Sequence, residues 1–362
     1  MILFCDFTPR VPIYDSAILN SLIKIKDNEM IFLTDPHSFN YYYSEDIREI
    51  IFHKNSSLLR LLKIIGIFYK PLSYFICWIS LFYILFKKKV SVVHFQWLSL
   101  YEKVNIELLL IKILRNYDVK IIYTVHNVVP HNSKNQIDRY LKLYNQFDYL
   151  ICHNEATKME IEEKIHDSTK IKVIPHGIFT TNSNSNSVNT EKKLLLYGFI
   201  SEYKGFDLLI KASSQILEHS LKIKVIGKIE KKYFKEIESD LSKSSIECLF
   251  DYISSDKLDD YIMESDILVF PYKKISQSGA LLKALGTGKI VVCSDLPAFR
   301  ELMGDNGLYF NLKDNEGLSK LLKYVLDNFD ELKQRFEEAS KKYLEQFSWE
   351  KVAQTTYNLY KL

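Results

Sequence analysis

Residues 272–292, YKKISQSGALLKALGTGKIVV, decide the fold. An apolar segment at 266–271 (DILVFP) predicts a strand, residues 276–279 a polar turn, residues 280–285 a short helix, and residues 289–293 a second strand. This order predicts a βαβ unit whose tightest turn lies at a helix N-terminus. Free backbone N–H groups and the positive end of the helix dipole meet there and favour a phosphate. Ser278 is equally suited to an ordinary helix cap.

Short β-branched and aromatic segments alternate with helical patterns along the rest of the chain. Most are continuously apolar, which is typical of parallel strands covered on both faces. Two successive series predict an α/β fold with two Rossmann-like, doubly wound domains. The predicted strands are 2–7, 30–34, 90–95, 119–125, 148–153 and 171–175, then 193–198, 222–227, 245–250, 266–271, 289–293 and 307–311.

A polar segment at 180–192, TTNSNSNSVNTEK, separates the two series. Its lack of periodicity predicts a flexible connection, although a long loop within one domain would have the same composition. We therefore predict domains at 1–180 and 193–346, followed by an amphipathic helix within 347–362. Ligands of such folds bind at the carboxyl ends of the strands, so we expect the site in a cleft between the domains.

Composition excludes several classes of protein. The formal net charge of +3 over 362 residues is too small to indicate nucleic-acid binding. The five cysteines form no CxxC pair, and the first residues carry no secretory signal pattern, so we expect a cytoplasmic protein. No DxD sequence and no His/Cys cluster with zinc spacing occurs, and we expect neither a metal nor another cofactor.

Several segments together resemble the family 4 glycosyltransferases, which have the GT-B fold. They are VVHFQW (92–97), YTVHNVVPH (123–131), LLLYGFISEYKGFDLLIKA (194–212), SDILVFPYKKISQSGALLKALGTGKIVVCSD (265–295) and the tail FSWEKVAQTTYNLYKL (347–362). The resemblance implies that the first domain binds the acceptor, that the second binds a nucleotide sugar, and that the last helix returns to the first domain.

The resemblance also implies roles for single residues of the second domain. Lys204 would lie near the donor diphosphate, with Gly198 allowing close backbone approach, and a solvated loop lysine is the alternative. Tyr252 and Ile253 occupy the loop that resembles the family's contact to the base. The implied donor contacts are Gly198, Phe199, Lys204, Tyr252, Ile253, Gln277, Ser278, Gly279 and Lys283.

In the first domain, His126 matches a family position near the transferred sugar, although a structural histidine at a strand end is the alternative. The general base stays open between His126, Asp6 and Asp15. The candidates for acceptor contacts are Arg10, Tyr14, His94, Trp97 and Asn127.

The chain departs from the family pattern in the donor loop. Ile275 and Lys283 stand where the family usually has two glutamates, and Phe199 stands where an arginine is frequent. A subgroup with a QSG turn shows the same loss of the first glutamate. The ammonium of Lys283, one helical turn beyond Gly279, either reaches back toward a phosphate or is an ordinary surface lysine.

Residues 59–89 form an apolar, aromatic segment with basic ends. Residues 71–86 carry no charge and 87–89 are lysines, but 16 uncharged residues are fewer than the roughly 20 that span a bilayer. The pattern favours a helix on an anionic membrane surface. A core helix against the first sheet is the alternative.

These observations predict a metal-independent hexosyltransferase that moves a sugar from a nucleotide-sugar donor to a glycan acceptor. We expect the acceptor to be lipid-linked, in bacterial surface polysaccharide biosynthesis such as capsule or O-antigen, at the inner face of the cell membrane. Two alternatives stay open. One is a non-catalytic nucleotide-binding or scaffold protein, and the other is a sugar-nucleotide epimerase of the same fold.

Overall fold

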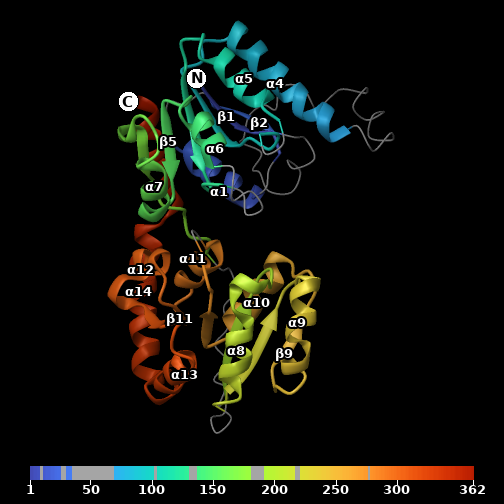
Figure 1. Ribbon diagram of the computed structural model, residues 1–362. Helices are drawn as coiled ribbons and strands as arrows, with labels where there is room; N and C mark the ends of the chain where they lie inside the picture. The colour runs from blue at the N-terminus through green and yellow to red at the C-terminus, as the bar shows by residue number, and fades with distance from the viewer. Residues whose placement is uncertain are drawn as a thin grey trace. The chain divides into compact units, whose positions relative to one another are not determined.

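The structure is a computed structural model that describes residues 1–8, 11–25, 30–34, 69–101, 104–129, 137–180, 191–216, 221–275 and 278–362. These residues form two compact units (Figure 1). The first comprises Met1–Pro175 with Trp349–Leu362, and the second comprises His176–Ser348.

The described part of the first unit contains a six-stranded parallel sheet in the order β2-β1-β3-β4-β5-β6. The strands are β1 (Ile2–Asp6), β2 (Met30–Thr34), β3 (Val92–Trp97), β4 (Lys120–Val125), β5 (Tyr149–Cys152) and β6 (Ile171–Val173). The helices are α1 (Pro12–Ile23), α4 (Tyr69–Lys87), α5 (Ile106–Leu114), α6 (Ile137–Tyr144), α7 (Glu155–Glu162), the 3-10 turn η2 (Ser168–Lys170) and α15 (Trp349–Lys361).

Alternate residues of the strands enter different hydrophobic clusters on the two faces of this sheet. On β1, Leu3 and Cys5 lie in the cluster that contains buried residues of α4 and α5. Ile2 and Phe4 lie in the cluster that contains buried residues of α1 and α15. This double burial explains why the strands are continuously apolar in sequence.

The described part of the second unit contains another six-stranded parallel sheet, in the order β12-β11-β10-β7-β8-β9. The strands are β7 (Lys192–Tyr197), β8 (Leu221–Ile226), β9 (Glu247–Leu249), β10 (Ile267–Phe270), β11 (Ile290–Ser294) and β12 (Leu308–Phe310). The helices are η3 (Glu202–Lys204), α8 (Phe206–Ser213), α9 (Lys231–Leu241), α10 (Ser255–Glu264), α11 (Gly279–Leu285), α12 (Pro297–Met303), η4 (Gly304–Asn306), α13 (Gly317–Asp327) and α14 (Phe329–Gln346).

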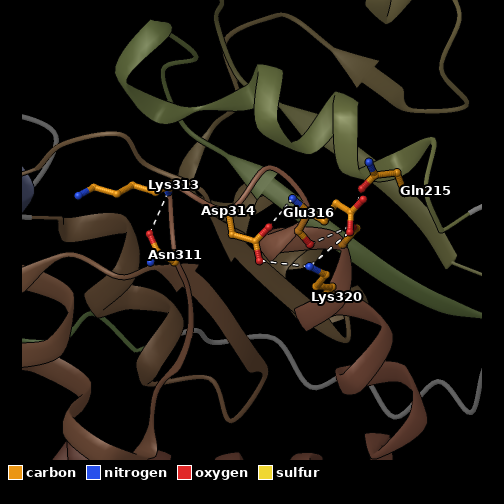
Figure 2. A network of polar contacts seen from close by, with 7 residues as sticks. Gln215, Asn311, Lys313, Asp314, Glu316 and Lys320 are labelled. Carbon is orange, nitrogen blue, oxygen red and sulfur yellow. Dashed lines mark hydrogen bonds and ion pairs between the residues drawn. The ribbon is translucent and has the colours of Figure 1, made fainter.

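A polar network fixes the start of α13 in the second unit (Figure 2). The Asp314 carboxylate accepts a hydrogen bond from the backbone N–H of Glu316 at 2.9 Å and lies 3.4 Å from the ammonium of Lys320. The hydroxyl of Ser319 hydrogen-bonds the side chain of Gln215, just beyond α8, at 2.5 Å. The network ties α13 to α8 across 104 residues of sequence.

The predicted class of two Rossmann-like, doubly wound domains is confirmed, and all twelve predicted strands are present. Strand ends differ by one or two residues, and β3 extends to Gln96 and Trp97. The apolar pattern from Lys204 onward predicts a single helix, which is wrong at its start, because Gly205 adopts φ +67° and separates η3 from α8. All five cysteines are free thiols.

Candidate functional site

The carboxyl edge of the first sheet gathers aromatic and titratable side chains that are distant in sequence. Asp6 ends β1, Trp97 ends β3, and His126 and His153 directly follow β4 and β5. Because neighbouring parallel strands end at the same edge, the last three of these side chains meet there, together with Tyr14 of α1. We call Tyr14, Trp97, His126 and His153 the edge cluster.

His126 is held in the edge cluster from several sides. Its ring stacks on Trp97 with centroids 4.5 Å apart and planes 10° apart, and Tyr14 meets it edge-on at 5.1 Å. Its Nε2 lies 3.0 Å from the side-chain oxygen of Gln96. His126 is half-buried, as is Asn127 beside it. The ring is therefore held in place, and part of the residue stays accessible.

The prediction of His94 as an acceptor contact is wrong for this structure, because the residue is buried. Its Nδ1 lies 2.6 Å from the hydroxyl of Tyr360, and its Nε2 lies 2.8 Å from the hydroxyl of Thr124. Burial, with a smaller effect of His153, lowers the pKa of His94 to about 3. The side chain is a neutral core histidine behind the edge cluster.

Asp6 and Asp15, both proposed as bases from the sequence, are buried next to each other. Burial raises the pKa of Asp15 well above its usual range, and the neighbouring charge and hydrogen bond of Asp6 raise it further. The Asp6 carboxylate also accepts a hydrogen bond from the backbone N–H of Thr8 at 3.1 Å. We therefore correct the prediction, since neither acid presents a carboxylate at the surface here.

Sequence reasoning missed two members of this region, His153 and Trp349. His153 donates from Nδ1 to the carbonyl of Ile174 at 2.9 Å, and burial lowers its pKa to about 4. Trp349 meets Tyr14 edge-on at 5.4 Å. One sequence signal could have identified His153, because β4 and β5 are both followed by the dipeptide His-Asn. Arg10 lies outside the described residues.

In the second unit, the turn after β7 places the side chain of Lys204 next to Gly198. Gly198 has φ +105°, and a Cβ there would lie 2.8 Å from the Lys204 ammonium. Only glycine therefore leaves room for both this backbone conformation and the ammonium. Gly227, which sequence reasoning missed, approaches the same turn, because a Cβ on it would overlap the carbonyl of Gly198.

Lys204 is 6% exposed, which excludes the solvated loop lysine. Its ammonium lies 3.4 Å from the carbonyl oxygen of Tyr197 and 4.9 Å from the centre of the Tyr272 ring. Among the described residues, no carboxylate lies within ion-pair distance of it. Burial lowers its pKa, and the neighbouring Tyr203 opposes that shift. The turn therefore holds a buried cation without a described counter-charge.

Lys283 is buried and forms an ion pair with Asp259 of α10. The sequence left Lys283 either as a surface lysine or as a cation that reaches toward a phosphate. In the structure it is neither, because the side chain is buried and its ammonium faces the carboxylate of Asp259.

Ser278 uses its hydroxyl to cap α11, accepting from the backbone N–H of Leu281 at 3.1 Å. A Cβ on Gly279 would meet no atom within 4 Å. The capping role of Ser278 is present, and its phosphate role stays a prediction. Gln277 lies outside the described residues.

Two aromatic side chains of the second unit are exposed. Phe199 follows Gly198, and Tyr252, in the loop between β9 and α10, is 69% exposed with Ile253 half-buried beside it. The Lys228 ammonium lies 5.7 Å from the centre of the Tyr252 ring. In the part of the chain that is described, no group of three or more His, Cys, Asp or Glu residues could hold a metal ion.

Two family models match the chain, one in each unit. Residues 191–328 match glycosyl transferases group 1, and residues 88–178 match the N-terminal domain of glucosyltransferase 3-like proteins. The first match contains the Gly198 turn and Lys204, and the second contains His126 and Gln96.

Two relatives are glycosyltransferases by name. An uncharacterized glycosyltransferase of Methanocaldococcus jannaschii is 25% identical over 176 residues, which are 48% of this chain and 45% of the relative. A GDP-mannose:glycolipid 4-beta-D-mannosyltransferase of Xanthomonas campestris pv. campestris is 23% identical over 181 residues, 48% of this chain and 49% of the relative. The chain thus spans about half the length of these relatives.

Solved structures resemble the chain over its whole length. A glycosyltransferase of Rickettsia africae ESF-5 has a TM-score of 0.73 at 17% identity, covering 99% of this chain and 97% of that one. HepE of Anabaena, solved in complex with UDP-glucose, has a TM-score of 0.70 at 16% identity, covering 100% and 99%. The fold of this chain is therefore the GT-B fold of two Rossmann-like domains.

Proposed function

We propose that this protein is a glycosyltransferase that moves a sugar from a nucleotide-sugar donor to a glycan acceptor. The observation that carries the proposal is the buried ammonium of Lys204 at the carboxyl end of β7, which has no described carboxylate partner. A buried cation costs free energy unless an anion compensates it, and a donor diphosphate supplies that anion. Both family matches and the UDP-glucose complex of HepE support the same class of ligand.

The second unit supplies the donor side of this proposal. The Lys204 ammonium would contact the diphosphate and stabilise the charge that develops on the departing nucleotide. Ser278 and Gly279 lie at the start of α11, and the exposed ring of Tyr252 offers a stacking surface for the base. The proposal needs no metal ion, because a cation of the chain opposes the phosphate charge.

The first unit supplies the acceptor side, with the half-buried His126 and Trp97 at its carboxyl edge. The Xanthomonas relative is named for transfer to a glycolipid, which supports a lipid-linked glycan as the acceptor. On that ground we place the reaction at the inner face of the cell membrane, in the biosynthesis of a bacterial surface polysaccharide. We propose that the sugar transferred from the donor is a hexose.

The experiment that tests the proposal begins with the donor. We expect one of the UDP-, GDP-, dTDP- or CMP-sugars to raise the melting temperature of the wild type but not of Lys204→Ala. The stabilising donor is then incubated with crude lipid-linked acceptor. Transfer establishes the reaction, whereas an epimerised sugar nucleotide formed without acceptor identifies an epimerase. No stabilisation by any donor at millimolar concentration would leave the scaffold alternative.

The helix α4 supports contact with a membrane surface. One of its faces packs in the core through Tyr74, Trp78 and Leu81, as the core-helix alternative requires. The opposite face, however, carries a stripe of exposed apolar side chains at helical spacing: Leu72, Phe75, Ile79, Tyr83 and Phe86. The described helices include none long and apolar enough to cross a bilayer.

The neighbouring helix α5 extends this apolar surface. It exposes Ile106, Leu109 and Ile113, and the ring of Tyr117 just beyond α5 lies 6.0 Å from the ring of Phe82 on α4. Figure 1 shows α4 and α5 on the same side of the first sheet. The exposed lysines 87–89 lie at the C-terminal end of the α4 stripe. Apolar side chains next to lysines fit the surface of an anionic bilayer.

Replacing Ile79 and Phe86 together by glutamate is expected to weaken binding to phosphatidylglycerol vesicles at least tenfold. These side chains are 67% and 79% exposed, so the change removes apolar area without emptying the core. Vesicle co-sedimentation measures the effect. Met159→Glu on α7 is the matched control, because Met159 is 58% exposed but lies outside the stripe. Equal vesicle binding by both variants would refute the membrane contact.

A further inference from the structure

The ammonium of Lys204 lies over the face of an aromatic ring that follows another strand of the second unit. Nζ of Lys204 is 4.9 Å from the centre of the Tyr272 ring and 3.4 Å from the carbonyl oxygen of Tyr197. Tyr272 lies two residues beyond the end of β10 and is buried, as is Lys204. A cation at this distance is attracted by the negative charge of the ring face, and the attraction is stronger where water is excluded.

Tyr272 meets the ammonium as a neutral ring and not as a phenolate. Burial raises the pKa of Tyr272 above its ordinary value, and an interaction with Ser278 opposes only part of that rise. The contact is therefore a cation–π interaction rather than an ion pair. Burial lowers the pKa of Lys204, and Tyr203 beside it opposes that shift. The Tyr272 ring acts in the same direction as Tyr203, because its face favours the charged form of the lysine.

The loop after β10 is attached to the turn η3 on both sides of the Tyr272 ring. The backbone N–H of Lys273 donates to the carbonyl oxygen of Tyr203 at 2.7 Å. On the other side, the carbonyl of Pro271 approaches Gly205 so closely that a Cβ on the glycine would overlap it. Since Tyr272 stands between these two attachments, the backbone itself fixes the ring close to the ammonium.

The Tyr272 ring is also packed among other aromatic side chains. Its centre lies 5.5 Å from that of Phe299 on α12 and 5.8 Å from that of Phe270 on β10, and Tyr203 meets it edge-on at 6.0 Å. Three neighbouring rings therefore hold Tyr272 in the orientation that presents its face to the ammonium.

We propose that Tyr272 is a positioning residue whose ring face keeps the Lys204 ammonium charged and in place before the donor binds. This inference rests on the proposed transferase function, because a donor diphosphate is the anion that such a cation would receive. Tyr272 is 1% exposed and does not itself touch the donor. The ring offsets only part of the cost of burying the ammonium, so a bound phosphate still adds stability.

The charge state of Lys204 can be measured without any ligand, by ¹³C NMR titration of the whole protein labelled at the Cε atoms of lysine. The signal is assigned by its loss in Lys204→Met. Tyr272→Phe keeps the ring face and is expected to leave the pKa of Lys204 unchanged. In place of Tyr272, 3,4,5-trifluorophenylalanine keeps the ring shape but withdraws charge from its face, and is expected to lower that pKa. The same pKa in the phenylalanine and trifluorophenylalanine proteins would overturn the proposal.

Calorimetry then measures the binding of the nucleotide sugar that stabilises the wild type. Tyr272→Leu, which removes the ring, is expected to weaken binding about 5- to 30-fold, whereas Tyr272→Phe stays within about twofold of the wild type. Phe299→Leu is the matched control, because Phe299 is fully buried and packs against Tyr272. It is expected to lower the melting temperature and to leave donor affinity within about twofold. Equal weakening of binding by both leucine variants would show a general disturbance of the core and overturn the role of Tyr272.

The pH dependence of donor binding separates this role from a structural one. A lysine with a lower pKa loses its charge at lower pH, so the affinity of the trifluorophenylalanine protein should begin to fall at a lower pH than that of Tyr272→Phe. Identical pH profiles of the two proteins would contradict the proposal. A wild type that binds no nucleotide sugar would refute the proposed function instead, while the NMR titration still decides whether the ring keeps Lys204 charged.

Discussion

Lys204→Met is expected to raise the stability of the ligand-free protein while it weakens donor binding. The ammonium is 6% exposed and has no described carboxylate partner, so methionine removes a desolvated charge and keeps most of the packing. We expect a gain of about 1 to 3 kcal/mol in the free energy of unfolding. The lost charge–phosphate contact is expected to weaken the nucleotide sugar about 30- to 100-fold.

The pH dependence of this gain has a definite sign. Burial lowers the pKa of Lys204 in the folded protein, so the folded protein releases this proton at lower pH than the unfolded chain. The buried charge of Lys204 destabilises the wild type fully below the pKa of Lys204 in the folded protein. This destabilisation vanishes as the pH rises above the pKa of the same lysine in the unfolded chain. The advantage of Lys204→Met over wild type should therefore shrink in alkaline solution, as measured by denaturant unfolding.

Lys283→Met is the matched control, because this second buried lysine of the same unit forms an ion pair with Asp259. Its removal leaves the carboxylate of Asp259 without a counter-charge and is expected to cost about 3 kcal/mol. The two substitutions are chemically identical and should change stability in opposite directions. A loss of stability in both variants would show that Lys204 is already compensated in the absence of donor.

Gly205→Ala is expected to destabilise the protein strongly at the donor turn. Gly205 has φ +67°, and a Cβ there would overlap the carbonyl oxygen of Pro271, which is a backbone atom that cannot turn away. The positive φ and the overlap together are expected to cost at least about 3 kcal/mol. Thermal unfolding should show a melting temperature lower by about 10 °C.

Gly288→Ala separates the two contributions. Gly288 has φ +73°, close to that of Gly205, but a Cβ on it would meet no atom nearer than 3.4 Å. Its replacement is expected to cost only about 1 kcal/mol, which is the cost of the positive φ alone. If both alanine variants lost the same stability, the overlap with Pro271 would have been relieved by a small shift of the chain.

Most strands were predictable because they are apolar segments between polar turns, and both faces of the sheet cover them. The predicted segment 30–34 matches β2, and the predicted segment 289–293 lies within one residue of β11 (Ile290–Ser294) at each end. The start of α8 was not predictable from its apolar pattern. Its position depends on Gly205, whose conformation is set by the approach of Pro271 from 66 residues away in sequence.

The candidate site was only partly predictable, because sequence shows which residues follow a strand but not which are covered. His94 and Asp6 were recognised as strand-end residues, yet α15 and α1 bury them. Gln96 had no signal of its own, since its contacts to His94 and His126 become visible only in the structure. Lys283 was identified, but its partner Asp259 lies on another helix, 24 residues earlier in the chain.

The placement of α15 also has a consequence for the order of events during synthesis. Val352 and Tyr360 complete a hydrophobic cluster whose other members begin at Ile2, and the bond between His94 and Tyr360 joins residues 266 positions apart. A ribosome releases all strands of the second unit before it releases α15. The unit that is translated first therefore reaches its final packing last, and until then its nascent sheet exposes an apolar face on which chaperones can act.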